Sequence, residues 1–488
     1  MAENDDEQLF DDLSRQSAPE RPSAAAARLR TAERRQVALR AVCLDDLVPE
    51  DHRVRMVWRF VEGLDLTALL VGIKSVEGRP GHPPADPRIL MALWLYATVE
   101  GVASARRVAR LCEEHVAYQW LCGGVGMNAK TLADFRVGHG AALERLLIDS
   151  FAALATAGVA SLDRIAQDGV RVRASAGAAS FRRHSTLEEC RAEAAEALAR
   201  LRREAQDDPG AASRREAAAR LRAAQDREHR VAKALDVTRE LHERQQERAR
   251  RREERAFREQ RKRANSGENG ASAPGTAKEP ETAKEKQQEN KKEQENKKEK
   301  EKEPRASTTD AEARVMKMAD GGFRPAYNVQ FASDTRSGAV AGVAVDNSGS
   351  DMGKMAPMNE ALAQDYGERP RQHLADGGYV KFDDIEALEN AGVEVYAPVP
   401  APRDKSRDRY APQQDDAPTI AAWRKRMSEE EAKDIYKQRA ATAECTNAQA
   451  RNRGLRQFLV RGVDKVKSIA LLHGLTHNMA CGWRLIAI

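Results

Sequence analysis

A long charged stretch divides this chain and limits how it can fold. Residues 263–310 contain very few apolar side chains, so they cannot offset the entropy lost on ordering, and we predict a disordered linker there. Residues 186–262 are dominated by Ala, Arg, Glu and Leu with a break at DDPG, which predicts two long charged helices forming a coiled-coil-like hairpin. The globular core must therefore come from the sequence on either side of this insertion.

The remaining chain is long enough for two or three domains. The whole chain has 488 residues, and its 41% hydrophobic content is ordinary for a soluble protein. The formal net charge of +5 is too small to identify a nucleic-acid-binding protein by itself. Residues 1–40 are polar and Ala/Arg-rich, and we expect them to be poorly ordered. They do not have the pattern of a signal peptide, and no apolar run could span a bilayer, so we expect a cytoplasmic protein.

Residues 41–160 show apolar positions at helical spacing, which predicts an all-α N-terminal domain. Three of its helices are expected to open at Asp86 with Pro87 behind it, at Ser104 and at Asn128. A helix and turn before the helix that carries Lys130 and Arg136 fit a helix-turn-helix, although any helical bundle would give nearly the same pattern.

On both sides of the insertion the pattern changes to strands. The first is LDRIAQDGVRVRAS, a hairpin follows in FRPAYNVQFASDTRSGAVAGVAVDN, and RQHLADGG and VEVYAPVP complete the set. Helices are expected between and after the last two strands, including one from a cap at Ser428 to Gly454. This order predicts an α/β fold with a mixed five-stranded sheet, flanked by helices and built from residues 161–185 and 311–488.

Two of the strands carry an Asp-Gly pair, Asp168 in the first and Asp376 before Gly377 and Gly378. Asp376 can open a sharp turn, or it can meet Asp168 at the strand ends, where sites form in such sheets. Among the rival carboxylates, Asp320 reads as a turn residue and Asp346 as a strand end. Asp351 is the best substitute should Asp376 be structural.

Four blocks in this order resemble a family. QDGVRVRASA, KMADGGFRPAYNVQFA, LADGGYV and the stretch from YKQRAATAECTNAQARNRG to LTHN are similar to the DDE-type transposases of bacterial insertion sequences, specifically the insertion sequence 1182 group within the insertion sequence 4 and 5 superfamily. PADPRILMALWLYATVEGVASARRVARLCEEHVAYQWL resembles the helical domain that precedes the catalytic domain in the same group. Together the blocks cover most of the chain outside the first 40 residues and the insertion.

The resemblance implies a ribonuclease H-like catalytic domain in which Glu444 is the third carboxylate beside Asp168 and Asp376. Tyr436, Arg439, Glu444 and Arg451 match the family's Tyr, Arg, Glu, Lys signature. Arg451 replaces the usual Lys, and Arg439 precedes Glu444 by five positions instead of four. The insertion after the first strand is a further departure, since relatives usually carry one before the Glu helix.

The implied chemistry is cleavage and joining of phosphodiesters. Two hard cations, Mg²⁺ with Mn²⁺ as a substitute, would stabilise the attacking and leaving oxygens and be held by Asp168, Asp376 and Glu444. The expected partner is double-stranded DNA, at element ends and targets, bound by a homodimer, with no membrane and no small-molecule substrate. The alternatives are a catalytically silent DNA-binding and assembly protein, and a ribonuclease H-like nuclease without strand transfer.

Basic residues on the last helices are candidates for phosphate contacts, and the alternative is that they only solvate amphipathic helices. They are Arg439, Arg451, Arg453, Arg456, Arg461, Lys465 and Lys467. His473 and His477 have the spacing of a metal-binding pair, but packing is the favoured interpretation because no Glu lies between them. The six cysteines have no paired spacing and predict neither zinc nor disulfide chemistry.

Overall fold

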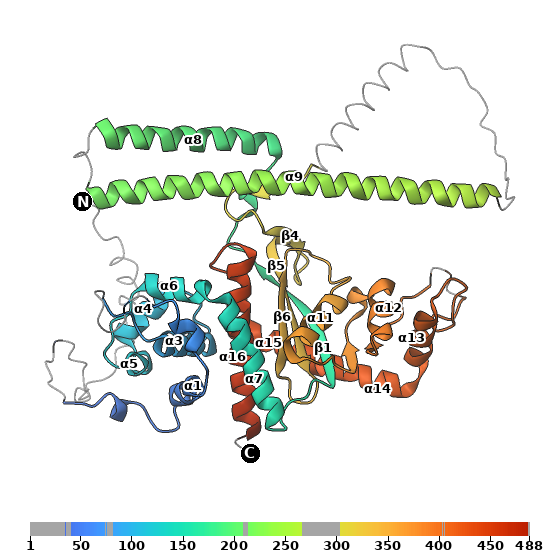
Figure 1. The fold of residues 1–488 in the computed structure, drawn as a ribbon, viewed down its shortest axis with the longest axis horizontal. Helices are drawn as coiled ribbons and strands as arrows, with labels where there is room; N and C mark the ends of the chain where they lie inside the picture. The colour runs from blue at the N-terminus through green and yellow to red at the C-terminus, as the bar shows by residue number, and fades with distance from the viewer. Residues whose placement is uncertain are drawn as a thin grey trace, which may run out of the picture.

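The computed structural model describes residues 35, 41–73, 75, 82–207, 213–265, 303–402, 404 and 406–486. A group of short helices is followed by a mixed sheet with helices packed on it, and a long two-helix insertion interrupts the sheet after its first strand (Figure 1). In the described part of the chain, no helix is both long and apolar enough to cross a membrane. The predictions for most of residues 1–40 and for 266–302 lie outside the described residues.

The N-terminal region is helical, as predicted. Its elements are η3 (Asp45–Leu47), α1 (Arg53–Glu62), α2 (Thr67–Leu70), α3 (Pro87–Val99), α4 (Ala105–Glu114), α5 (Val116–Cys122), α6 (Ala129–Gly138) and α7 (Gly140–Thr156). The predicted caps are confirmed, since Asp86, Ser104 and Asn128 each accept a hydrogen bond from a backbone N–H of the first helical turn.

The central sheet is mixed. Its strands are β1 (Arg164–Arg173), β4 (Arg314–Lys317), β5 (Phe323–Asp334), β6 (Val340–Asp346), β7 (Gln372–Leu374) and β8 (Glu394–Tyr396). The order is β4-β5-β1-β7-β8, and β6 also pairs with β5. β5 runs antiparallel to its three neighbours, whereas β7 is parallel to both β1 and β8.

The predicted number of five strands is wrong, because β4 adds a sixth. β4 pairs with Phe323–Ala326 of β5 through a tight turn, in which Met318 N donates to Gly322 O (2.7 Å) and Gly321 has a φ of 81°. The four residues RVMK are too short to show a strand period in the sequence. β4 lies on the same edge of β5 as β6, so the sheet remains five strands wide.

The insertion leaves the sheet after β1 and returns before β4. Its elements are η4 (Ala178–Ser180), β2 (Phe181–Arg182), α8 (His184–Asp207), α9 (Arg214–Asn265) and β3 (Ala306–Ser307), with β2 and β3 antiparallel. α8 and α9 lie side by side, as the predicted hairpin requires (Figure 1).

The predicted linker extends too far at its C-terminal end. Ala306, Ser307 and Asp310 are buried, and Tyr327 donates a hydrogen bond to Asp310 (2.8 Å). Polar composition concealed this segment, because hydrogen bonds of its polar side chains order it together with the burial of small apolar residues such as Ala306 and Ala311.

The C-terminal elements follow the sheet strands. They are α11 (Met355–Tyr366), η5 (Gly377–Tyr379), α12 (Phe382–Asn390), α13 (Pro418–Ser428), α14 (Glu430–Arg439), the π-helical turn η6 (Ala440–Glu444), α15 (Cys445–Asn452) and α16 (Val463–Ile486). The prediction of a helix opened by Ser428 is wrong, since Ser428 ends α13 and its hydroxyl donates to Lys425 O (2.6 Å). Gly454 does follow the last helical turn of α15, as predicted.

The two faces of the sheet are covered by different helices. Val170, Val172 and Phe331 belong to the core that includes α16 and the N-terminal helices. Ile165 and Ala332, on the opposite face by strand alternation, pack with Met358 and Leu362 of α11. α16 runs beside α7 (Figure 1) and joins the helical region to the sheet in one core.

Two glycines bring the N-terminal helical region and the end of α15 into close contact. Gly101 follows α3 and Gly454 follows α15, with φ values of 70° and 90°, and each terminates its helix in a Schellman motif. A Cβ on Gly454 would lie 2.9 Å from Gly101 O. A side chain at this contact would therefore clash with backbone and not with a movable side chain.

We predict that Gly454→Ala lowers the free energy of unfolding by roughly 3 kcal/mol, from left-handed strain plus the backbone clash. Gly158→Ala is the matched control, because Gly158 also has a positive φ (70°) but no atom within 4 Å of a new Cβ. It should cost only about 1–2 kcal/mol. Urea unfolding measures both variants, and equal losses would contradict the close-contact explanation.

Buried histidines on α16 should make stability depend on pH. Burial lowers the pKa of His473 to about 3 and that of His477 to about 4. His477 donates from Nε2 to Gly338 O (2.9 Å), which raises its pKa, but burial and the nearby charge of Arg453 lower the pKa by more. Because the unfolded chain takes up protons below its ordinary pKa of about 6.5 and the folded chain does not, stability is lost as pH falls below that value.

The free energy of unfolding should fall between pH 6.5 and 5 by about 1.4 kcal/mol per pH unit for each of these histidines. His473→Gln should remove the contribution of one protonating group from the slope of the free energy of unfolding against pH. Urea unfolding at pH 7.0, 6.0 and 5.0 tests this, and a wild-type stability that does not change across this range would contradict it.

Candidate active site

Asp168 lies within β1, and Asp376 follows β7, the parallel strand next to β1. The register pairs Ile165 with His373 and Ala166 with Leu374. Each aspartate is two residues beyond the last of these pairs, so Asp168, in the middle of β1, lies beside Asp376 just past the end of β7, where neighbouring chains are about 4.8 Å apart. The Asp376 carboxylate is close enough to contribute to the raised pKa of Asp168.

Asp376 does open the turn that its glycines suggest. Its Oδ1 accepts a hydrogen bond from Gly378 N (2.7 Å) at the start of η5. A Cβ on Gly378 would lie 2.9 Å from the same oxygen, whereas a Cβ on Gly377 would have no atom within 4 Å. The turn therefore fixes the carboxylate beside Asp168, so the turn and the site require the same residue.

The Asp168 carboxylate is partly buried under α15. Burial is the largest cause that raises its pKa, and the hydrogen bond from Gly169 N (2.9 Å) and the positive charge of Arg439 oppose this. Its Oδ2 accepts a hydrogen bond from Asn447 Nδ2 (2.9 Å). Asn447 was not predicted from the sequence, although its position three residues after Glu444 places both on one helix face.

Arg439 and Tyr436 complete the surroundings of the two aspartates. The Arg439 guanidinium lies 5.9 Å from the centre of the Tyr436 ring, and its side chain is only 13% exposed. Burial raises the pKa of Tyr436, which also lies close enough to feel Arg439, Asp376 and Asp168. These two signature residues are thus brought together with the two aspartates.

Glu444 lies at the end of the π-helical turn. Arg439 Nη2 contacts Glu444 Oε1 (3.3 Å) across five positions, a spacing that faces one side of a π-helix but not of an α-helix. The turn therefore accommodates the extra residue between Arg439 and Glu444. The Glu444 side chain is 64% exposed, and within the described ranges no three His, Cys, Asp or Glu side chains form a ready metal cluster.

The rival carboxylates are occupied elsewhere. Asp351 accepts hydrogen bonds from Asn328 (2.6 Å) and Gln330 (2.8 Å) on the sheet face opposite Asp168, and it also contacts Arg171 (3.6 Å). Asp351 and Gln330 fill the space next to Gly169, where a Cβ would lie 2.6 Å and 2.4 Å from their atoms. Asp320 pairs with Arg324 in its turn and Asp346 with Lys354.

Two of the predicted DNA-binding residues are internal. Arg136 is 7% exposed, lies over the Trp94 ring (4.4 Å) and donates to Ala103 O, and burial lowers its pKa to about 10. This position contradicts the prediction that Arg136 reads DNA bases. Arg453 is largely buried against His477. The apolar periodicity of α6 gave no sign that an arginine would be inside.

Three other predicted DNA-binding residues are accessible. Lys130 has an 82% exposed side chain, which pairs with Asp134 (2.5 Å). Arg451, in the last turn of α15, and Arg456, just after it, are exposed; Arg456 Nε donates to Arg451 O (3.2 Å), and Arg456 O accepts from Arg173 N at the end of β1. These two arginines therefore lie beside the strand that carries Asp168.

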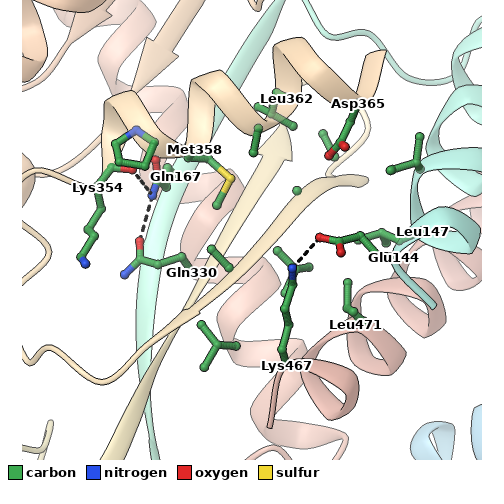
Figure 2. A pocket seen from close by; sticks show the side chains of 18 of the residues that line it. Glu144, Leu147, Gln167, Gln330, Lys354, Met358, Leu362, Asp365, Lys467 and Leu471 are labelled. Carbon is green, nitrogen blue, oxygen red and sulfur yellow. Dashed lines mark hydrogen bonds and ion pairs between the residues drawn. The ribbon is translucent and has the colours of Figure 1, made fainter. Parts of the chain in front are cut away.

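A cavity of about 230 Å³ lies elsewhere, between α7, β6, α11 and α16 (Figure 2). Gln167 reaches it from β1 and is bonded there to Gln330 (3.0 Å) and to Lys354 O (3.3 Å). Strand alternation places Asp168 on the other face. None of the three predicted carboxylates lines this cavity, so it is separate from the candidate site.

Two models of known families match this chain. Residues 42–137 match a model described as Transposase domain (DUF772), and residues 298–479 match one described as Transposase DDE domain. The second range contains Asp376 and Glu444, while Asp168 lies outside both ranges. No significant match was found among curated proteins or solved structures.

Proposed function

Because this chain belongs to the DDE-type transposases of insertion sequences, we propose that it binds the ends of its element, cleaves DNA there and joins the freed ends to a target. The observation that supports the chemistry best is the parallel pairing of β1 with β7, which brings Asp168 of β1 beside Asp376, two residues after β7. Transposition is the activity of the family. End recognition, strand transfer and the insertion sequence 1182 group are the parts that we propose.

We propose a ribonuclease H-like catalytic domain formed by residues 161–185 and 311–488. The strand order β6-β5-β1-β7-β8, with β5 antiparallel and β7 and β8 parallel to β1, supports it. In this arrangement the central strand carries Asp168, and the next parallel strand leads to Asp376. The N-terminal domain 41–160 and the insertion 186–310 stand outside this sheet.

The residues present fit a divalent cation. Asp168 and Asp376 supply neighbouring oxygens, and the amide oxygen of Asn447 is buried with no hydrogen-bond partner in the described structure. Hard cations such as Mg²⁺ and Mn²⁺ prefer such oxygens. We propose that Asp168, Asp376 and Glu444 hold the metal, which would activate the attacking oxygen and neutralise the leaving one. Arg439 and Tyr436 would position the scissile phosphate and Glu444.

Arg451 and Arg456 would hold DNA phosphates next to β1, and Lys130 would contact the element ends from α6. The family acts on DNA, and we propose that a homodimer binds the two ends in the cytoplasm, at the nucleoid. A catalytically silent DNA-binding protein, or a nuclease that cuts without joining, remains the alternative outcome of the experiments below.

Asp168→Asn, Asp376→Asn and Glu444→Gln should each reduce Mg²⁺-dependent nicking of an element-end duplex by at least about a thousandfold. The reason is that a metal supplies several kcal/mol of transition-state stabilisation, and about 4 kcal/mol corresponds to that factor. End binding in a gel-shift assay should change little. Asp351→Asn is the matched control and should nick normally. If Asp376→Asn also nicks normally, the second carboxylate is misassigned.

Arg451→Ala with Arg456→Ala should weaken binding to every duplex and reduce the salt dependence by about 0.9 per lost phosphate contact, or roughly two in all. Lys130→Ala should instead reduce the preference for element ends over random DNA. Binding of end and random duplexes across a salt series measures both effects. If the salt dependence of the double variant equals that of the wild type, Arg451 and Arg456 do not contact DNA phosphates.

A further inference from the structure

Asn447 is a buried asparagine beside the candidate metal site, and only one of its two polar side-chain atoms has a hydrogen-bond partner. It is 5% exposed, and its Nδ2 donates to Asp168 Oδ2 (2.9 Å). Its Oδ1 is buried and has no partner in the described structure. Leaving such an oxygen unpaired costs its full desolvation, so a buried amide oxygen without a protein partner points to a ligand.

The helix around Asn447 is fixed so that the amide cannot turn away. Thr446, its neighbour, is buried and forms a hydrogen bond to Ser333 of β5 (3.1 Å) and to Thr442 O (3.2 Å) in the preceding turn. The π-helical turn places Glu444 and Asn447 one turn apart on the same helix. α15 is thereby docked on β5 through Thr446 and on β1 through Asn447.

In the described structure the Glu444 carboxylate is exposed and paired with Arg439, so it leaves room for a further oxygen donor beside Asp168. Asn447 is the polar side chain of α15 that reaches Asp168 directly. Carboxylates, amide carbonyls and water are the ligands that Mg²⁺ and Mn²⁺ prefer, and Mg²⁺ retains several waters.

We propose that Asn447 belongs to the metal site. Its Nδ2 orients the Asp168 carboxylate, and its Oδ1 binds the cation held by Asp168, directly or through one of the cation's waters. The inference rests on the proposed function, because it requires a cation at Asp168. It adds a residue to which neither the sequence signature nor the family comparison gives a role.

Mn²⁺ binding to the full-length protein on an end duplex tests this, with free Mn²⁺ followed by electron paramagnetic resonance. Asn447→Leu, similar in shape and without polar atoms, should weaken Mn²⁺ binding at least about tenfold. Asn447→Asp keeps an oxygen at this position and should bind Mn²⁺ as tightly as the wild type or more tightly. Its melting temperature should also rise more on adding Mn²⁺.

Asn359→Leu is the matched control. Asn359 is a fully buried asparagine of α11, and its Oδ1 accepts a hydrogen bond from Arg369 (2.9 Å). This variant should leave Mn²⁺ binding unchanged. Wild-type binding by Asn447→Leu, or weaker binding by Asn447→Asp, would overturn the role of Asn447. Asp168→Asn distinguishes failure of this inference from failure of the proposed metal site. If Asp168→Asn and Asn447→Leu both bind Mn²⁺ normally, the proposed metal site is wrong. If Asp168→Asn loses Mn²⁺ binding but Asn447→Leu does not, only the role of Asn447 is wrong.

Discussion

The register between β1 and β7 is the constraint on which the candidate site depends. Three residue pairs and the bond from Gln372 N to Asp163 O (2.9 Å) fix it, and an ion pair joins Arg371 to Asp163 beside the first pair. A slip of one residue would turn Asp376 to the other face of the sheet and separate it from Asp168. Only three residues of β7 are paired, so the polar contacts at its start are as important as the ladder itself.

Asp168 and Gly169 meet different requirements on the two faces of β1. Its carboxylate needs partners because it is partly buried, and Gly169 N, Asn447 and the nearby charge of Arg439 supply them. On the other face, Gln330 and Asp351 fill the space in which a larger residue at 169 would have its Cβ. The Asp-Gly pair is therefore needed for packing as well as for chemistry, and the carboxylate and the glycine serve different faces.

Features that depend on a few neighbouring residues can be predicted from this sequence. Helix caps at Asp86, Ser104 and Asn128 were correct because a cap depends on a few neighbouring residues. β4 and the ordered segment around Asp310 were missed, since short pairing and hydrogen-bonded burial leave no periodic signal. Arg136 was misplaced because its partners, Trp94 and Ala103, are distant in sequence. Asn447 was missed for the same reason: its partner Asp168 lies far away, before the insertion.

The central claim is that Asp168 and Asp376 hold a divalent cation that the family's chemistry uses. The most direct measurement is anomalous diffraction from crystals of the protein on an end duplex, grown with Mn²⁺. We expect an anomalous peak within about 2.2 Å of carboxylate oxygens of both aspartates. Ordered density for both side chains without a peak between them, or a peak only at Asp346 or Asp351, would contradict the account.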